Sequence, residues 1–291
     1  MCHQPVLRDW YFGCGDTTKM DYGSPVYCAE KDKPGHKIEK RVVGSSNKEG
    51  KCGRTSFVHC VKEGVVGKVP RKTHDEKLNA EFKNAFAVEK QLLERLGDHP
   101  RIAMNGLLLE EATHGHLQSY IDGDSKIDSA LRKKWCLQIV EAVAYVHEKG
   151  IIHSNVGTTN ILVHQTGQTM DLKLADFGGS RCLELGLNGD LIPDDPFLDR
   201  QLTDFTSPRV DVFSLGVVIY IIMTGHYPFH KGPAPQNEEI YVYEDRVQKL
   251  FGQGKFPDLS DVPFGVVIAG CCCERRFENA KEVVEALEAE M

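Results

Sequence analysis

The chain reads His153-Ser-Asn-Val-Gly-Thr-Thr-Asn160-Ile-Leu-Val163, and Asp176-Phe177-Gly178 follows sixteen residues after Asn160. Asn160 offers an amide oxygen and Asp176 offers a carboxylate oxygen, and a hard cation such as Mg²⁺ prefers oxygen ligands. Either residue alone could simply belong to a turn, because Asn and Asp are common there. The two motifs together, preceded by His153, predict a metal site formed by Asn160 and Asp176.

A lysine and a glutamate lie upstream of these motifs. Val-Val-Gly-Lys68 ends a predicted strand, and Glu89 lies in the predicted helix that follows. The apolar residues on the same face of that helix are Phe82, Phe86, Leu93 and Leu96. Glu89 therefore points toward an apolar interior, where an unpaired carboxylate is costly. We expect Lys68 to pair with it; in the alternative, Glu89 reaches solvent at the edge of the apolar stripe.

Local patterns divide the chain into unequal parts. Residues 1–39 show no sustained period and predict an irregular extension, whereas residues 40–109 carry short β-branched strands and one helix over 76–96. A short connector at 110–114 leads into residues 115–291, where helices dominate. The clearest of these is a helix over 131–147 with Trp135, Ile139 and Val143 on one face. The prediction is an α+β fold with two lobes, and a crevice between lobes commonly holds a ligand.

Taken in order, the strand lysine, the helix glutamate, a loop of pattern H-R-D-x-x-x-x-N and the D-F-G triplet resemble the protein kinase superfamily, from about residue 40 to 291. The segments Asp211-Val-Phe-Ser-Leu-Gly216 and Thr224-Gly-His-Tyr-Pro-Phe229 resemble the buried central helix of that family's large lobe and its exit. Leu96-Gly-Asp-His-Pro-Arg-Ile102 adds a likeness to small kinase-like proteins of filamentous fungi. The resemblance implies a bilobal protein-kinase-like domain that binds ATP and Mg²⁺ between its lobes and acts on a protein substrate.

The same resemblance assigns the nucleotide site. Lys68 would hold the α- and β-phosphates of ATP. The apolar positions that match the adenine slot are Val58, Val66, Ala112 and Leu162, with backbone hydrogen bonds from Glu110 and Ala112. The glycine-rich loop is poorer, because only Gly53 remains of its three glycines and Ser56 replaces another. Side chains hinder the backbone from approaching phosphates there, so a plain hairpin turn stays an alternative.

Departures from the family pattern bear on the mechanism. Asn155 stands where the family has its catalytic aspartate, and an amide cannot accept a proton near neutral pH, although its oxygen accepts hydrogen bonds. Gly157 replaces the next cation of the loop, and Ser154 replaces the arginine that normally captures an activation-loop phosphate. We therefore expect slow Ser/Thr-type transfer at best. A pseudokinase that serves as a scaffold or regulatory module is the close rival, and a small-molecule kinase is the third possibility.

Composition narrows the remaining classes. The chain has 35 Lys and Arg against 42 Asp and Glu, a net charge of -7, which argues against unspecific binding to nucleic acid. Its longest apolar run, Val217–Met223, is too short to span a bilayer. No signal peptide is visible, so the ten cysteines are expected to be free thiols in a cytoplasmic or nuclear protein. No metal site is expected among them.

Overall fold

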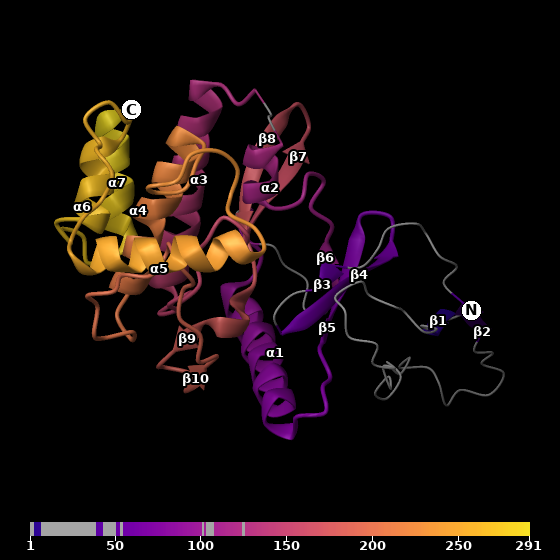
Figure 1. The fold of residues 1–291 in the computed structure, drawn as a ribbon. Helices are drawn as coiled ribbons and strands as arrows, with labels where there is room; N and C mark the ends of the chain where they lie inside the picture. The colour runs from indigo at the N-terminus through magenta and orange to yellow at the C-terminus, as the bar shows by residue number, and fades with distance from the viewer. Residues whose placement is uncertain are drawn as a thin grey trace.

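The computed structural model describes residues 3–6, 39–42, 51–52, 55–100, 102, 108–123 and 126–291. Figure 1 shows a smaller part built from strands and one long helix beside a larger part built mainly from helices. The predicted α+β class with two unequal lobes is confirmed. The boundary between an N-terminal extension and the domain stays a prediction; within residues 1–42, β1 (His3–Val6) and β2 (Glu39–Val42) pair as parallel strands.

A four-stranded antiparallel sheet in the order β3-β4-β5-β6 forms the small lobe. Its strands are β3 (Lys51–Cys52), β4 (Ser56–Lys62), β5 (Val65–Pro70) and β6 (Leu108–Glu110). The turn between β4 and β5 contains Gly64 with φ of 73°, a backbone conformation that glycine adopts without strain. The register places Val58 opposite Lys68 and Val66 opposite Leu109. Because opposite residues of paired strands point to the same face, Val58, Val66 and Lys68 share one face of the sheet.

Helix α1 (Glu76–Leu96) spans the residues predicted for it. Asp75 caps its start by accepting hydrogen bonds from the backbone N–H groups of Lys77 and Leu78, and the helix ends at Gly97, whose φ is 62°. Its buried face consists of Phe82, Ala85, Val88, Glu89, Leu92, Leu93 and Leu96. Phe86, which the sequence assigns to that face, is only half-buried. The helix packs against β5 and against the 3-10 turn η1 (Phe177–Gly179), so it carries Glu89 between the lobes.

The large lobe surrounds one apolar helix, α4 (Arg209–Thr224), which is buried from Val210 to Ile222. Its other helices are α2 (Leu117–Asp122), α3 (Ser129–Glu148), α5 (Glu238–Gly252), α6 (Gly265–Cys272) and α7 (Ala280–Glu290). Its strands form two hairpins, β7 (Ile161–Thr166) with β8 (Thr169–Leu174), and β9 (Arg181–Cys182) with β10 (Leu187–Asn188). None of the described helices is both long and apolar enough to cross a bilayer.

The hydrophobic core lies where α3, α4, α6 and α7 meet. Trp135, Ile139 and Val143 of α3 are almost completely buried, as the apolar spacing over residues 131–147 predicts. Each such side chain contributes about 1.5–3 kcal/mol through removal from water. This core supports the β7–β8 hairpin, and the residues flanking that hairpin form the candidate site.

Candidate functional site

Three of the predicted site residues meet between the lobes. The Lys68 ammonium on β5 lies 2.9 Å from Oε1 and 2.8 Å from Oε2 of Glu89 on α1. The same nitrogen lies 2.6 Å from Oδ1 of Asp176, which precedes η1. The side chains of Lys68 and Glu89 are only 8% and 7% exposed, whereas that of Asp176 is 42% exposed. Lys68 therefore pairs with Glu89 within the small lobe and with Asp176 of the large lobe, and only the Asp176 end faces solvent.

Burial and charge act against each other in this cluster. Burial raises the pKa of Glu89 above its ordinary value, and the Lys68 charge opposes that shift only in part. Burial also disfavours the ionised form of Asp176, but the Lys68 ammonium outweighs it and holds the pKa of Asp176 below its usual range. Burial likewise disfavours charged Lys68, yet the two carboxylates raise its pKa. Lys68 and Asp176 are therefore both charged near neutral pH.

A hydrogen bond joins the two asparagines of the loop from His153 to Asn160. Asn160 Nδ2 donates to the backbone carbonyl of Asn155 at 2.9 Å. The amide oxygen of Asn160 therefore points away from that carbonyl. The backbone carbonyl of Asn160 accepts from Ala175 N–H at 2.9 Å, so Asn160 lies beside the residue that precedes Asp176. The Asn155 side chain is half-buried. The backbone of Asn160 thus lies beside the segment that leads into Asp176.

His153 fixes the loop from within. Its Nδ1 accepts from Asn155 N–H at 3.3 Å, so its Nε2 carries the proton and donates to the Ala175 carbonyl at 3.1 Å. Burial lowers the pKa of His153, which keeps the ring neutral in this arrangement. The ring also contacts Phe177 edge-on, with centroids 4.8 Å apart. His153 therefore connects the Asn155 segment to the Asp176 segment.

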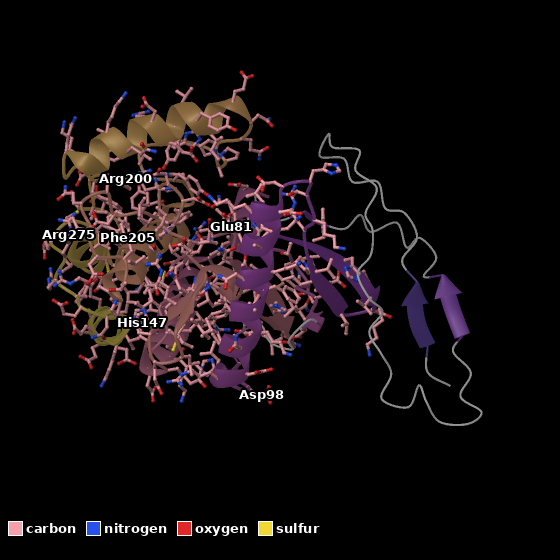
Figure 2. All side chains as sticks on the ribbon, turned by 90° about the horizontal axis from the view of Figure 1, so that it is seen from below. Glu81, Asp98, His147, Arg200, Phe205 and Arg275 are labelled. Carbon is pink, nitrogen blue, oxygen red and sulfur yellow. The ribbon has the colours of Figure 1, made fainter. Side chains whose placement is uncertain are left out.

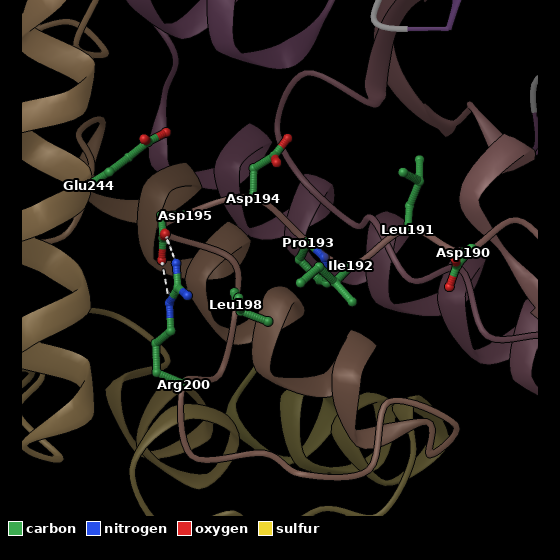
Figure 3. Close-up of a pocket in the computed structure, with 9 residues that line it drawn as sticks. All are labelled: Asp190, Leu191, Ile192, Pro193, Asp194, Asp195, Leu198, Arg200 and Glu244. Atoms are coloured by element: carbon green, nitrogen blue, oxygen red, sulfur yellow. Dashed lines mark hydrogen bonds and ion pairs between the residues drawn. The ribbon is translucent and has the colours of Figure 1, made fainter. Parts of the chain in front are cut away.

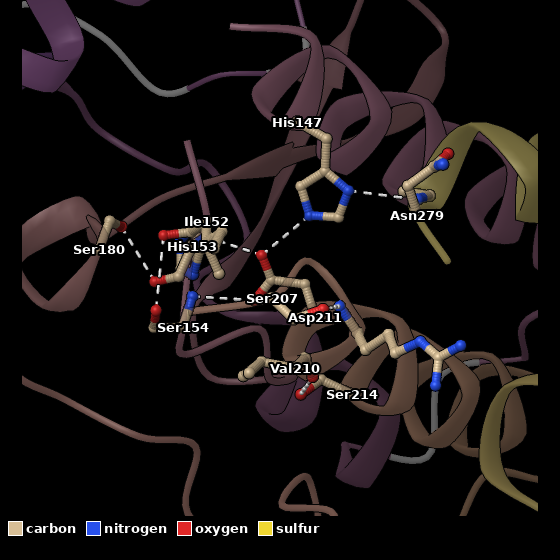
Figure 4. A network of polar contacts seen from close by, with 12 residues as sticks. His147, Ile152, His153, Ser154, Ser180, Ser207, Val210, Asp211, Ser214 and Asn279 are labelled. Atoms are coloured by element: carbon tan, nitrogen blue, oxygen red, sulfur yellow. Dashed lines mark hydrogen bonds and ion pairs between the residues drawn. The ribbon is translucent and has the colours of Figure 1, made fainter. Parts of the chain in front are cut away.

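Asp211 of the buried helix α4 anchors the loop from below (Figure 4). Its carboxylate accepts the backbone N–H groups of His153 at 2.7 Å and Ser154 at 2.8 Å. It also accepts from His147 Nε2 at 3.0 Å, and His147 Nδ1 in turn accepts from Ala280 N–H at 3.2 Å. Ser154 adopts φ of 62°, a conformation that costs free energy in a residue with a side chain and persists where neighbouring contacts enforce it.

The residues present fit a magnesium ion that also uses ligands from a nucleotide. Among the described residues, no group of three His, Cys, Asp or Glu side chains could hold a metal alone. Asp176 and Asn160 offer one carboxylate and one amide oxygen, and Mg²⁺ completes its shell with phosphate oxygens and water when protein ligands are few. This donor set suits a metal–nucleotide complex better than a free ion.

The structure describes most of the residues predicted for the base of the nucleotide and for the glycine-rich loop. Val58 and Val66 are half-buried on the sheet face that carries Lys68. Leu162 on β7 is half-buried and forms a bridge with His116. Ser56 is buried at the start of β4, opposite Pro70, and Gly53 lies outside the described residues.

The connector between the lobes carries the remaining two predicted residues. Ala112 is half-buried there, and its carbonyl accepts from Gly115 N–H at 3.4 Å. The Glu110 carboxylate accepts from Lys173 Nζ of β8 at 2.6 Å, and this hydrogen bond lowers the pKa of Glu110. Glu111 N–H donates to the Gly64 carbonyl at 3.0 Å. The connector is thus tied to the sheet on one side and to the large lobe on the other.

Gly157 is covered by an aromatic side chain that the sequence does not predict there. A β-carbon on Gly157 would lie 3.3 Å from Cδ2 and 3.4 Å from Cε2 of Phe197. Phe197 is buried, and its carbonyl accepts from Ser214 Oγ of α4 at 2.8 Å. The position that lacks a cation is therefore also closed to a longer side chain unless Phe197 moves.

An ion pair between the partly exposed Arg275 and the buried Asp199 supports the segment that carries Phe197. Arg275 Nε and Nη2 donate to the two carboxylate oxygens of Asp199 at 2.8 and 2.9 Å, and Asp199 is buried. Arg275 lies on the side of the large lobe that faces away from α1 (Figure 2). Asp199 lies shortly before α4 and Arg275 lies after Cys273, and no local spacing in the sequence connects the two residues.

The sequence is similar to those of several known proteins. A family model described as protein kinase domain matches residues 49–285. Serine/threonine-protein kinase ppk25 of Schizosaccharomyces pombe is 28% identical over 220 residues, which cover 69% of this chain and 50% of that protein. Serine/threonine-protein kinase kin-29 of Caenorhabditis briggsae is 30% identical over 146 residues, 45% of this chain and 18% of that protein. Ribosomal protein S6 kinase alpha-1 of Homo sapiens is 28% identical over 189 residues, 58% of this chain and 24% of that protein. These aligned regions span half or less of the length of each relative.

Proposed function

The chain belongs to the protein kinase superfamily, and on that premise we propose that it binds ATP with Mg²⁺ between its lobes and transfers the γ-phosphoryl group slowly to a Ser or Thr hydroxyl of a protein. The observation that carries the proposal is the position of Lys68, whose ammonium contacts Glu89 and Asp176 at once. Phosphoryl transfer depends mainly on positioning and on electrostatic stabilisation of the phosphates. Positioning of the phosphates and stabilisation of their charge both require a cation that is held in one place.

Lys68 is fixed by its burial and its partners. Glu89 compensates its charge on the buried side, and the exposed Asp176 leaves the opposite side open to phosphate oxygens. When bound, the magnesium ion would neutralise charge on the phosphates, with Asn160 and Asp176 as its protein ligands. The apolar faces of Val58, Val66 and Leu162 would enclose the adenine ring, with backbone groups of Glu110 and Ala112 as its hydrogen-bond partners.

Asn155 limits the rate of transfer. Its amide oxygen can accept a hydrogen bond from a substrate hydroxyl and orient it toward the phosphate. It cannot take the proton, and loss of a general base typically costs about 10²- to 10⁴-fold. We therefore infer a slow enzyme rather than an efficient one.

The second candidate is a pseudokinase that acts as a scaffold or regulatory module. The contact between Phe197 and Gly157 favours it, because the loop cation is absent and its place is closed by a buried ring. A scaffold of this kind would act without transferring a phosphoryl group. Nucleotide, where it binds, would stabilise one arrangement of the lobes.

Thermal unfolding with ATP, in the presence and absence of Mg²⁺, tests nucleotide binding directly. A ligand that binds the folded state at 100 times its Kd stabilises it by about 2.7 kcal/mol. We expect a higher Tm with ATP and Mg²⁺ than with either alone. Transfer of radiolabelled phosphate to a peptide and to small metabolites is measured on the same preparation.

Variants separate the candidates. Asp176→Asn should remove the Mg²⁺ dependence of the shift, and Asp261→Asn, which changes an exposed aspartate outside the site, serves as the matched control. A wild-type protein with no shift at millimolar ATP would contradict the nucleotide-binding proposal. A shift without any transfer favours the scaffold, and transfer to a metabolite but to no peptide favours a small-molecule kinase.

A further inference from the structure

A tight turn in the loop from His153 to Asn160 ends at the predicted magnesium ligand. Asn160 N–H donates to the Gly157 carbonyl at 2.9 Å, so Thr158 and Thr159 are the central residues of this turn. Thr159 is exposed, whereas Thr158 is completely buried. The position of Asn160 therefore depends on how the interior of the large lobe holds Thr158.

Gln118 of α2 holds Thr158 through a pair of hydrogen bonds. The backbone N–H of Gln118 donates to the Thr158 carbonyl at 3.2 Å, and the Thr158 hydroxyl donates to Oε1 of Gln118 at 2.8 Å. Gln118 is only 4% exposed. Because both residues are buried, loss of either partner would leave a polar group unsatisfied in the interior.

Asp122 determines which way the Gln118 amide faces. Gln118 Nε2 donates to Oδ1 of Asp122 at 2.9 Å, and the same oxygen accepts from Ala234 N–H at 3.2 Å. An ionised carboxylate accepts hydrogen bonds and donates none. The amide nitrogen of Gln118 must therefore face Asp122, which leaves the amide oxygen to face Thr158.

Phe197 holds the first residue of the turn from a different segment of the chain. Its ring lies against Gly157, and the side chains of Asp195 and Arg200 form an ion pair across the segment that carries it (Figure 3). The ring acts on Gly157 through its shape, whereas Gln118 acts through directional hydrogen bonds. The two constraints on the turn can therefore be removed separately.

We propose that Gln118 is a positioning residue for the predicted magnesium ligand Asn160, because it orients Thr158 and with it the turn that ends at Asn160. The part of this inference that concerns magnesium rests on the proposed function, and the part that concerns the turn does not. Residues that orient a metal ligand typically contribute about 10- to 100-fold to metal affinity. Gln118 acts through the backbone of the turn, so we expect the lower end of this range.

Hydrogen exchange of the unliganded protein tests the positioning of the turn. Thr158→Val removes the hydroxyl and keeps the shape of the side chain, Thr158→Ser keeps the hydroxyl, and Thr159→Val makes the matched change at the exposed neighbour. We expect the Asn160 N–H to exchange about tenfold faster in Thr158→Val than in the wild type, and within about twofold in the other two variants. If Thr158 only stabilised the fold, exchange of the buried N–H groups of α4 would rise while that of Asn160 would not.

Thermal unfolding with ATP tests the consequence for magnesium. The measured quantity is the Mg²⁺ concentration that gives half of the Mg²⁺-dependent rise in Tm. We expect this concentration to be about tenfold higher in Thr158→Val than in the wild type, and unchanged within about twofold in Thr158→Ser and Thr159→Val. The rise in Tm with ATP alone should be the same in all four proteins, since none of these changes alters the contacts of Lys68.

Asp122→Ala is the second variant, because Asp122 is only half-buried and its loss releases the Gln118 amide. It should change both quantities in the same direction as Thr158→Val. The inference is overturned if exchange of the Asn160 N–H is unchanged in folded Thr158→Val and Asp122→Ala proteins, or if Thr159→Val changes it equally. An unchanged Mg²⁺ midpoint in variants that bind ATP with magnesium also overturns it. A wild-type protein without any Mg²⁺-dependent shift contradicts the proposed function instead, and hydrogen exchange then decides alone whether Gln118 positions the turn.

Discussion

Phe197 lies against the α-carbon of Gly157, so that a β-carbon on Gly157 would be 3.3 Å from the ring. This distance is shorter than an ordinary carbon contact, and the ring is buried and held through its own backbone. The contact couples the loop from His153 to Asn160 to the segment that precedes α4. Any attempt to restore a cation at position 157 must therefore displace Phe197 first.

We expect Gly157→Ala to lower the free energy of unfolding by about 1 kcal/mol, the smaller end of the cost of overpacking. The corresponding loss of Tm is about 2–4 °C for a protein of this size. Gly252→Ala at the end of α5 is the matched control, because a β-carbon there meets nothing within 4 Å. Thermal unfolding of both variants measures the difference, and equal losses would show that Phe197 does not constrain Gly157.

Restoring a carboxylate at the loop tests whether the remaining site is assembled for transfer. Asn155→Asp should raise phosphate transfer to a peptide by about 10²-fold or more, the lower end of what a general base supplies. Gly157 is left unchanged in this experiment, so that Phe197 keeps its place. A folded, ATP-binding Asn155→Asp protein without detectable transfer would contradict the slow-kinase proposal and support the scaffold, since a base has no effect on misplaced reactants.

Removing Lys68 should make stability depend on pH through Glu89. Burial already raises the pKa of Glu89 above 4.5, and Lys68→Met removes the cation that opposes this shift. A carboxyl whose folded pKa is raised contributes stability that is lost as the pH rises through that pKa. Between pH 4.5 and the raised pKa of Glu89 in the folded state, we expect the free energy of unfolding of Lys68→Met to fall by up to about 1.4 kcal/mol per pH unit.

The double variant Lys68→Met/Glu89→Gln provides the control for that slope. It removes the buried titrating group and leaves Asp176 as it is in the single variant. Urea unfolding at a series of pH values should give a flat difference for the double variant. A pH-dependent loss that persists in the double variant would assign the effect to another group.

Arg275→Ala should cost about 2 kcal/mol, because it removes two donors from the buried Asp199 carboxylate and leaves it with the Gln201 N–H. The neighbouring Arg276→Ala is the control: Arg276 pairs with Glu274, and both side chains are about half exposed. Its expected effect is below about 0.5 kcal/mol. Urea unfolding compares them, and similar losses would mean that the Asp199 pair is not a structural anchor.

Sequence predicts best where a residue's role is set by its neighbours in the chain. The span of α1 follows from its apolar spacing, its Asp75 cap and Gly97, all within one segment. Lys68 and Glu89 could be paired in advance, because a buried carboxylate on an apolar face requires a partner. The ion pair between Lys68 and Asp176 forms because the two lobes pack together, and no local sequence pattern specifies that packing.

The features that sequence missed depend on contacts between distant segments. Asp199 and Arg275 carry no recognisable motif, and their pairing depends on how α4 and α6 pack. In the sequence, Phe197 is an aromatic residue in a loop without a recognisable role. The structure shows that its ring covers Gly157.

The link from Ala280 through His147 to Asp211 has a consequence for synthesis on the ribosome. Domains begin to fold while the chain emerges, from the N-terminal side first. The catalytic-loop residues emerge early, but Ala280, whose N–H fixes the ring that donates to Asp211, emerges long afterwards. A nascent chain stalled before α7 would therefore display the loop sequence with an incomplete support. The support of the loop is therefore completed only after α7 has emerged.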